Sequence, residues 1–314
     1  MRLSTLSRSL GAIAAASLVF AAAPASASAT LFSGLYVFGD SLSDNGNLFA
    51  LTGGTVPPAP YYQGRFSNGP VAAEVLASGL GLLPSQFHDM AIAGARTGTG
   101  GQVPGTGMLN QVAGFGSVLA GANADSGALY MVWGGANDLR GGASIGEVVS
   151  NLSSIVSTLH GFGATQFLLP NLPDLGLTPE AREAADVAPG VTASATATYL
   201  STLFNQQLAT AYGNLAALWG DEQFYDADVF GAQRAITDGS PGNGFSNVSS
   251  GCIATAGCNP ANFLYWDQIH PTAAAHQILG DQMLAAVSVP EPQAMLLTAS
   301  ALLIMLGFSR RRQA

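Results

Sequence analysis

The chain has 314 residues, a formal net charge of −9 at pH 7, 9% charged residues and 39 glycines. Hydrophobic residues make up 48%, too many for a disordered polymer, and Gly and Pro interrupt them too often for a protein with several membrane spans. All ten basic residues are arginines, which excludes lysine-dependent phosphate loops and Schiff bases and argues against nucleic acid as a partner.

Residues 1–29 have the composition of a secretory signal peptide. Arg2 and Arg8 give a basic start, residues 10–23 are apolar and small, and Ala27-Ser28-Ala29 offers an A-x-A cleavage site. A buried core helix is the alternative, but the segment is terminal and ends in small polar residues. We therefore expect an exported protein whose mature chain starts at Thr30.

From residue 30 onward, apolar runs alternate with helical patterns. Strands are predicted at 34–38, 87–93, 128–133 and 164–169. Helices are predicted at 70–80, 144–160, 191–218 and 271–287, and residues 223–225 are predicted to be the core of a further short helix. This rhythm favours an α/β fold with a parallel sheet that is covered on both faces. Such a fold binds its ligand beyond the carboxyl ends of the strands.

A candidate nucleophile follows the first predicted strand. Residues 38–47 read Phe-Gly-Asp-Ser-Leu-Ser-Asp-Asn-Gly-Asn, which places Ser41 at the turn from strand to helix. A serine there can expose its hydroxyl while its own N–H points into the same space, so one residue supplies a nucleophile and an oxyanion donor. On this segment alone, a helix N-cap followed by an Asn-Gly turn is the more common outcome.

Two glycine-containing turns could supply further oxyanion donors. Ala93-Gly94-Ala95 follows the second predicted strand, and Gly94 would permit a close backbone approach. Residues 134–138, Gly-Gly-Ala-Asn-Asp, end the third strand, and the amide of Asn137 could donate a hydrogen bond. Each segment by itself is an ordinary glycine turn.

An alternative nucleophile is Ser144. Residues 142–146, Gly-Ala-Ser-Ile-Gly, fit the G-x-S-x-G elbow of another esterase fold. That elbow requires a strand that runs straight into the serine, whereas residues 134–142 intervene here. We therefore expect Ser144 to be a helix N-cap.

The stretch 236–262 is rich in Gly, Ser and Asn and holds both cysteines, Cys252 and Cys258. In an exported protein a disulfide between them is expected, worth about 2 kcal/mol for so short a loop. Its role would be local ordering. A catalytic or metal-bound thiol lacks a matching cluster of ligands.

Asp267 and His270 could provide the base that a serine nucleophile needs. Their spacing on a turn can bring the carboxylate onto the imidazole Nδ1–H and leave Nε2 free to take a hydroxyl proton. The alternatives are a helix cap, or a metal pair of His270 with His276, for which no third ligand is evident. The other histidines, His88, His160 and His276, have no carboxylate placed in this way.

The end of the chain has a separate character. Val-Pro-Glu-Pro at 289–292 precedes fifteen apolar or small residues at 294–308 and then Arg310-Arg311-Arg312. As a helix the apolar stretch spans roughly 22 Å, short for a hydrocarbon core, yet it could form a short transmembrane segment with local thinning of the bilayer. Residues 290–314 resemble the PEP-CTERM sorting signal of bacterial envelope proteins. This resemblance implies an exosortase as processing partner and release or anchoring at the cell surface.

The blocks at 38–47, 93–95, 134–138 and 267–270, in this order, resemble the GDSL or SGNH hydrolase family over nearly all of residues 30–289. The resemblance implies one domain with a three-layer, flavodoxin-like α/β/α sandwich. It implies a triad of Ser41, Asp267 and His270, and oxyanion donors from Ser41, Gly94 and Asn137. The sequence departs from the family pattern at Ala93, where many members have a second glycine.

We therefore expect an exported esterase or lipase that uses no metal or organic cofactor. Its substrate would be a small ester, a lipid or an acylated polysaccharide, and Tyr61, Tyr62, Phe66 and the 236–262 stretch could line the groove. Residues 30–289 carry five arginines and eighteen acidic residues, a net charge of −13 that disfavours strongly anionic polymers. The alternatives are an acyltransferase with the same site and a catalytically silent protein that binds surface polysaccharide.

Overall fold

The fold is built on one parallel sheet, seen in a computed structural model that describes residues 32–220, 222–239 and 244–288. Its strand order is β2-β1-β3-β4-β5. The strands are β1 (Leu35–Gly39), β2 (Phe87–Asp89), β3 (Leu129–Trp133), β4 (Gln166–Pro170) and β5 (Gln223–Ala227). This is the flavodoxin-like order, in which the chain reverses its direction of growth between β1 and β3. The predicted α/β fold is confirmed.

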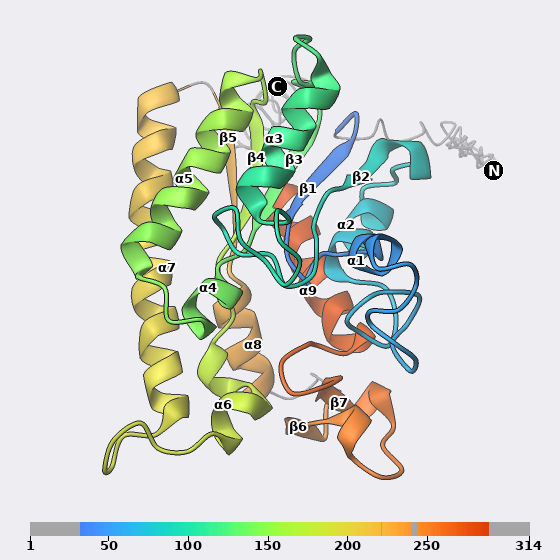
Figure 1. Cartoon of the computed structure of the whole chain (residues 1–314), viewed down its shortest axis with the longest axis vertical. Coiled ribbons are helices and arrows are strands. Elements are labelled where there is room, and N and C mark those ends of the chain that lie inside the picture. Colours follow the sequence, from blue (N-terminus) through green and yellow to red (C-terminus); the bar gives the residue numbers. More distant parts are fainter. Residues whose placement is uncertain (1–31, 221, 240–243, 289–314) are drawn as a thin grey trace, which may run out of the picture.

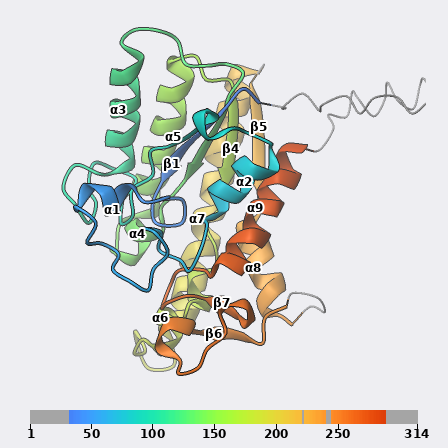
Figure 2. The same cartoon turned by 90° about the vertical axis from the view of Figure 1, so that its right-hand side faces the viewer.

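Helices cover both faces of the sheet, which gives three layers (Figures 1 and 2). One face carries α3 (Met108–Leu119), α5 (Ile145–Gly161) and α7 (Ala193–Trp219). The other carries α2 (Ala72–Gly79), α8 (Val229–Thr237) and α9 (Ala273–Ser288).

Short elements complete the described part of the chain. The short α-helices are α1 (Asn47–Leu51), α4 (Ala136–Arg140) and α6 (Pro179–Glu183). The 3₁₀ turns are η1 (Pro84–Gln86), η2 (Leu175–Leu177), η3 (Cys252–Ala254) and η4 (Pro260–Asn262). A separate parallel pair, β6 (Asn247–Gly251) with β7 (Phe263–Tyr265), lies at the end of the molecule that also holds α6 (Figure 1).

The sheet has a hydrophobic core on each face because side chains of a strand alternate between faces. Leu35 and Val37 of β1 pack with α2 and α9, whereas Phe38 packs with α3 and α5. All five residues of β3 are buried, as expected for a central parallel strand. Each large buried side chain contributes roughly 1.5–3 kcal/mol, so the two cores hold the carboxyl edge of the sheet in a fixed shape.

Two predicted elements differ from the structure. Residues 223–225, predicted as the core of a short helix, belong to strand β5, because Phe224 and Tyr225 pair with Phe167 and Leu168 of β4 and three residues cannot display a helical period. The strand predicted at 87–93 ends at Asp89. There the Asp89 carboxylate accepts the N–H of Ala91 at 2.8 Å and turns the chain, although Met90 and Ile92 still donate to carbonyl groups of β1.

The predicted signal peptide at 1–29 and the sorting tail at 290–314 lie outside the described residues. Across residues 32–220, 222–239 and 244–288, no helix combines the length and apolar character needed to span a bilayer.

Candidate active site

Ser41 lies two residues beyond the end of β1, at the switch point of the sheet. The turn that holds it closes through hydrogen bonds from the N–H groups of Ser43 and Asp44 to the carbonyl of Asp40, at 3.1 and 2.9 Å. A further bond runs from the N–H of Leu42 to the Asp40 carboxylate at 3.0 Å. These bonds reverse the chain directly at the sheet edge, so Ser41 is held by backbone geometry and only 8% exposed.

Asp267 and His270 occupy the loop between β7 and α9 and reach Ser41 through an unbroken series of hydrogen bonds. Asp267 Oδ2 lies 2.7 Å from His270 Nδ1, and His270 Nε2 lies 2.9 Å from Ser41 Oγ. The second carboxylate oxygen, Asp267 Oδ1, accepts the N–H groups of Ile269 and His270 at 2.8 and 2.7 Å. This arrangement lets the imidazole take the serine proton while the carboxylate orients the ring.

The charge of Asp267 is stabilised inside the protein. Burial by itself would raise the pKa of this carboxyl, but hydrogen bonds and charge attraction from His270, with the backbone N–H groups of His270 and Ile269, lower its pKa to about 2. The hydroxyl of Tyr61 also donates to Asp267 Oδ2, at 2.7 Å. Asp267 is therefore ionised throughout the neutral range.

The two other predicted oxyanion donors, Gly94 and Asn137, lie at the same edge. Gly94 has a φ of +77°, and a Cβ there would stand 2.6 Å from Cβ of Gln102, so only glycine fits. Its N–H and that of Ser41 donate to no group among the residues that the structure describes. Both are free to receive a substrate oxygen.

Asn137 stands in the first turn of α4, directly after β3. Its Nδ2 donates to the carbonyl of Ala95 at 3.0 Å and, at 3.4 Å, to the carboxylate of Asp40. The longer bond is the weaker one and is the one that a substrate oxygen would replace. Asn137 thus holds its place through one amide hydrogen and offers the other.

Asp40 is a buried acid beside Ser41 that sequence reasoning missed. Burial raises its pKa to about 6, against the opposing hydrogen bond from the N–H of Leu42 and the attraction of His270. Its position next to the nucleophile was readable from the sequence, but its burial was not.

An apolar cavity of about 130 Å³ opens beside Ser41 and His270. Its lining comes from β3, α4, η2, α6, α7, α8, β7 and α9, and includes the side chains of Trp133, Leu175, Leu200, Val229, Leu264 and Leu279. An apolar cavity of about 150 Å³ holds a benzene molecule, so this one has room for roughly six carbon atoms.

The predicted groove lining was largely wrong. Tyr61, Tyr62 and Phe66 do not line the cavity, and of the 236–262 stretch only Ile236 does. Instead, the ring of Phe66 lies 4.9 Å from the ring of His270, and Tyr61 contacts Asp267. Tyr61 and Phe66 therefore contact the residues of the base and not the cavity, because their loop is bound to the loop of Asp267 and His270.

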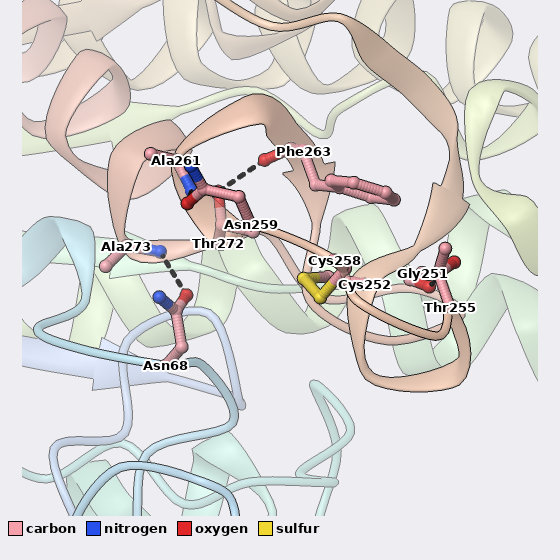
Figure 3. The surroundings of a disulfide bond; sticks show 10 residues. All are labelled: Asn68, Gly251, Cys252, Thr255, Cys258, Asn259, Ala261, Phe263, Thr272 and Ala273. Carbon is pink, nitrogen blue, oxygen red and sulfur yellow. Dashed lines mark hydrogen bonds between the residues drawn. A yellow bond between two sulfur atoms is a disulfide. The ribbon is translucent and has the colours of Figure 1, made fainter.

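The alternative site residues have structural roles. The hydroxyl of Ser144 accepts the N–H of Glu147 at 3.3 Å as the N-cap of α5. His276 is fully buried between α2 and α9, where its Nδ1 accepts the N–H of Ala72 at 3.1 Å. Cys252 and Cys258 form a disulfide (Figure 3), and the N–H of Ile253 beside it donates to the carbonyl of Trp266 at 2.8 Å.

A serine, histidine and aspartate joined in this order, at the switch point of a flavodoxin-like sheet, define a class of protein: carboxylic ester hydrolases with an α/β/α sandwich. The sequence model of the family described as GDSL-like Lipase/Acylhydrolase matches residues 35–283. The chain belongs to this family.

Individual relatives are distant. A phosphatidylcholine-sterol acyltransferase of Aeromonas hydrophila is 28% identical over an alignment 307 residues long. The alignment covers 80% of this chain and 88% of the relative. A GDSL esterase/lipase of Arabidopsis thaliana is 24% identical over 308 residues, with the same two coverages of 80% and 88%. A solved structure from the lipolytic G-D-S-L family of Veillonella parvula matches with a TM-score of 0.47 and 11% identity, over 82% of this chain and 99% of its own.

Proposed function

We propose that this chain is an exported serine hydrolase that cleaves carboxylic esters through an acyl-enzyme on Ser41. The observation that carries the proposal is the continuous path from Asp267 Oδ2 through His270 to Ser41 Oγ, with distances of 2.7 and 2.9 Å, beside an apolar cavity. No other described serine stands in such an array; Ser144 is occupied as a helix cap.

The proposed reaction has two halves. Ser41 Oγ attacks the ester carbonyl and passes its proton to His270 Nε2, while the N–H groups of Ser41 and Gly94 and the amide of Asn137 stabilise the oxyanion. His270 then protonates the leaving alcohol, which departs and leaves the acyl group on Ser41. A water molecule then gives a proton to His270 and attacks the acyl carbonyl. As the bond to Ser41 Oγ breaks, His270 returns this proton to Oγ and the carboxylic acid leaves.

We propose that the acyl chain enters the cavity beside Ser41. Its apolar lining favours hydrocarbon, and its size suits medium chains of roughly six carbons. The alcohol part of the natural substrate would belong to a lipid, an acylated polysaccharide or a smaller ester.

The proposal of export rests on the composition of residues 1–29. Residues 290–314, with Pro-Glu-Pro, an apolar stretch and three arginines, support sorting to a bacterial envelope by an exosortase-type protease. The pairing of Cys252 with Cys258 fits an oxidising compartment.

Acyl transfer to an alcohol is the second candidate. It needs the same residues with an alcohol in place of water, and the similarity to the Aeromonas acyltransferase favours it. A silent polysaccharide-binding role would leave the complete Asp267–His270–Ser41 array without a use.

The test is turnover of p-nitrophenyl esters from acetate to decanoate by the full chain, Ser41→Ala and Ser144→Ala. We expect Ser41→Ala to lose turnover and Ser144→Ala to retain it, with a loss of about 1 kcal/mol of stability from the missing cap. The reverse pattern would move the nucleophile to Ser144. A wild-type rate equal to that of Ser41→Ala would favour the binding protein, and ester products formed with an added alcohol would identify transfer.

A further inference from the structure

One short segment, residues 61–68, is bound at both of its ends to the loop that carries the base and to the start of α9. Besides the bond from Tyr61 to Asp267 and the ring contact of Phe66 with His270, the hydroxyl of Ser67 donates to the carbonyl of Pro271 at 2.9 Å. Asn68 Oδ1 accepts the N–H of Ala273 at 2.8 Å, which caps the start of α9 (Figure 3). We call residues 61–68 the brace.

The position of Tyr61 within the brace is fixed from several sides. Its ring packs against Phe66 and Trp266, with centroid distances of 5.5 and 6.3 Å, and it joins the cluster of Cys252, Cys258 and Phe263 at the disulfide. Burial and the neighbouring Asp267 carboxylate both raise the pKa of Tyr61 well above its usual value. The Tyr61 hydroxyl therefore stays protonated at any working pH and always acts as the donor.

The backbone behind Asp267 is fixed as well. Gly251, at the end of β6, lies so close to Asp267 that a Cβ would stand 2.6 Å from the Asp267 carbonyl oxygen. The main chain of Asp267 is therefore held by the backbone of Gly251, and its carboxylate is held by the hydroxyl of Tyr61.

We propose that Tyr61 is a positioning residue of the hydrolytic site, which fixes the Asp267 carboxylate and moderates the charge that His270 experiences. This inference rests on the proposed function. Asp267 Oδ2 accepts from both Tyr61 and His270 Nδ1, at 2.7 Å each. A second donor on this oxygen takes up part of its negative charge, so the bond from Tyr61 weakens the pull of the carboxylate on the imidazolium while it holds Oδ2 within reach of Nδ1.

The test compares Tyr61→Phe with Tyr62→Phe. Tyr62 is the matched control, since it is the adjacent residue of the same brace and its hydroxyl bonds to none of the described residues. We expect Tyr61→Phe to lower kcat/KM about tenfold, mainly through kcat, because the Asp267 carboxylate loses a bond that holds it in place and orients His270 less well toward Ser41 Oγ. Tyr62→Phe should remain within about twofold of wild type.

The pH profile separates positioning from simple loss of structure. Besides Asp267, the charged groups near His270 are Asp40, which follows β1, and Arg140 of α4, and both are the same in the wild type and in Tyr61→Phe. Without the Tyr61 hydroxyl, Oδ2 presents its full charge to His270 and favours the imidazolium, so the acid limb of kcat/KM should move upward relative to wild type by about 0.5 to 1 pH unit. A merely structural role would lower the rate at every pH and leave the limb in place. In an Asp267→Asn background, the change Tyr61→Phe should cost less than about twofold, since the charged acceptor is gone.

Three outcomes would overturn the inference: an acid limb that does not move, a full tenfold loss in the Asp267→Asn background, or a rate equal to that of Tyr62→Phe. If Ser41→Ala is inactive while Tyr61→Phe behaves like wild type, the proposed function stands and only the role of Tyr61 fails. If Ser41→Ala keeps activity, the proposed function itself fails. Thermal unfolding of each variant shows whether it has folded.

Discussion

At the scale of single residues, Asn137 shows how an amide is held ready for a substrate. Its Nδ2 is anchored on Ala95 and makes only a long bond to Asp40. We predict that Asn137→Ala lowers kcat at least about 100-fold with little change in KM, because the oxyanion exists only in the transition state. Steady-state kinetics on one ester measure this. An unchanged kcat would remove Asn137 from the oxyanion site.

The depressed pKa of Asp267 predicts a pH-dependent contribution to stability. A carboxyl with a pKa of about 2 in the folded chain, against 3.8 when unfolded, stabilises the fold fully above pH 5 and loses this contribution as the pH falls toward 2. We predict that Asp267→Asn lowers the free energy of unfolding by about 2 kcal/mol at pH 7 and by roughly half as much at pH 3. Urea titrations at both values test this, and a constant difference would contradict it.

The residues of the site differ in how far sequence could locate them. Most of the site follows a predicted strand or precedes a predicted helix, so the fold brings it to the carboxyl edge of the sheet. This holds for Ser41, Gly94, Asn137, Asp267 and His270. Tyr61 was expected in a substrate groove. Its partner Asp267 lies 206 positions away, and the loop between Leu51 and Ala72 has no periodicity that would place it.

At the scale of elements, helix α7 forms one wall of the cavity through Ala197 and Leu200. We predict that Ala197→Phe lowers kcat/KM for octanoate about tenfold relative to acetate, because the ring displaces about two methylene groups from apolar surroundings. Ala195→Phe is the matched control, since Ala195 is exposed on the same helix and does not line the cavity.

The chain-length series of p-nitrophenyl esters measures this effect. An unchanged preference in Ala197→Phe would show that the acyl chain binds elsewhere. Equal effects of both substitutions would assign the change to helix α7 as a whole.

Long elements with a clear pattern were predictable, and short ones were not. Helix α5 shows a helical period of apolar residues over seventeen positions, and strand β3 is a continuous apolar run. Both patterns can be recognised in the sequence. The helix predicted at 223–225 is wrong because three residues show no helical period, and strand β5 is defined by its pairing with β4. The pair β6 and β7 is set by contacts with the disulfide cluster and the base loop, which local sequence does not record.

At the scale of the whole molecule, the excess of acidic residues sets the response to salt. The full chain carries a net charge of −9, and like charges repel in the compact state. We predict that its thermal midpoint at pH 7 rises by about 2–4 °C between about 0.01 and 0.3 M NaCl. Near the isoelectric point of about 4.6 the rise should shrink. Scanning calorimetry tests both, and a midpoint that falls with salt at pH 7 would contradict the prediction.

The hydrogen-bonded array joins the two ends of the described chain. Among the described elements, Ser41 follows the first strand, whereas Asp267 and His270 precede the last helix, α9, which packs against α2. Because a nascent polypeptide leaves the ribosome from its N-terminus, its serine emerges more than two hundred residues before its histidine. Until His270 has emerged, the growing polypeptide carries the serine of the array without its histidine, and this site cannot yet attack an ester.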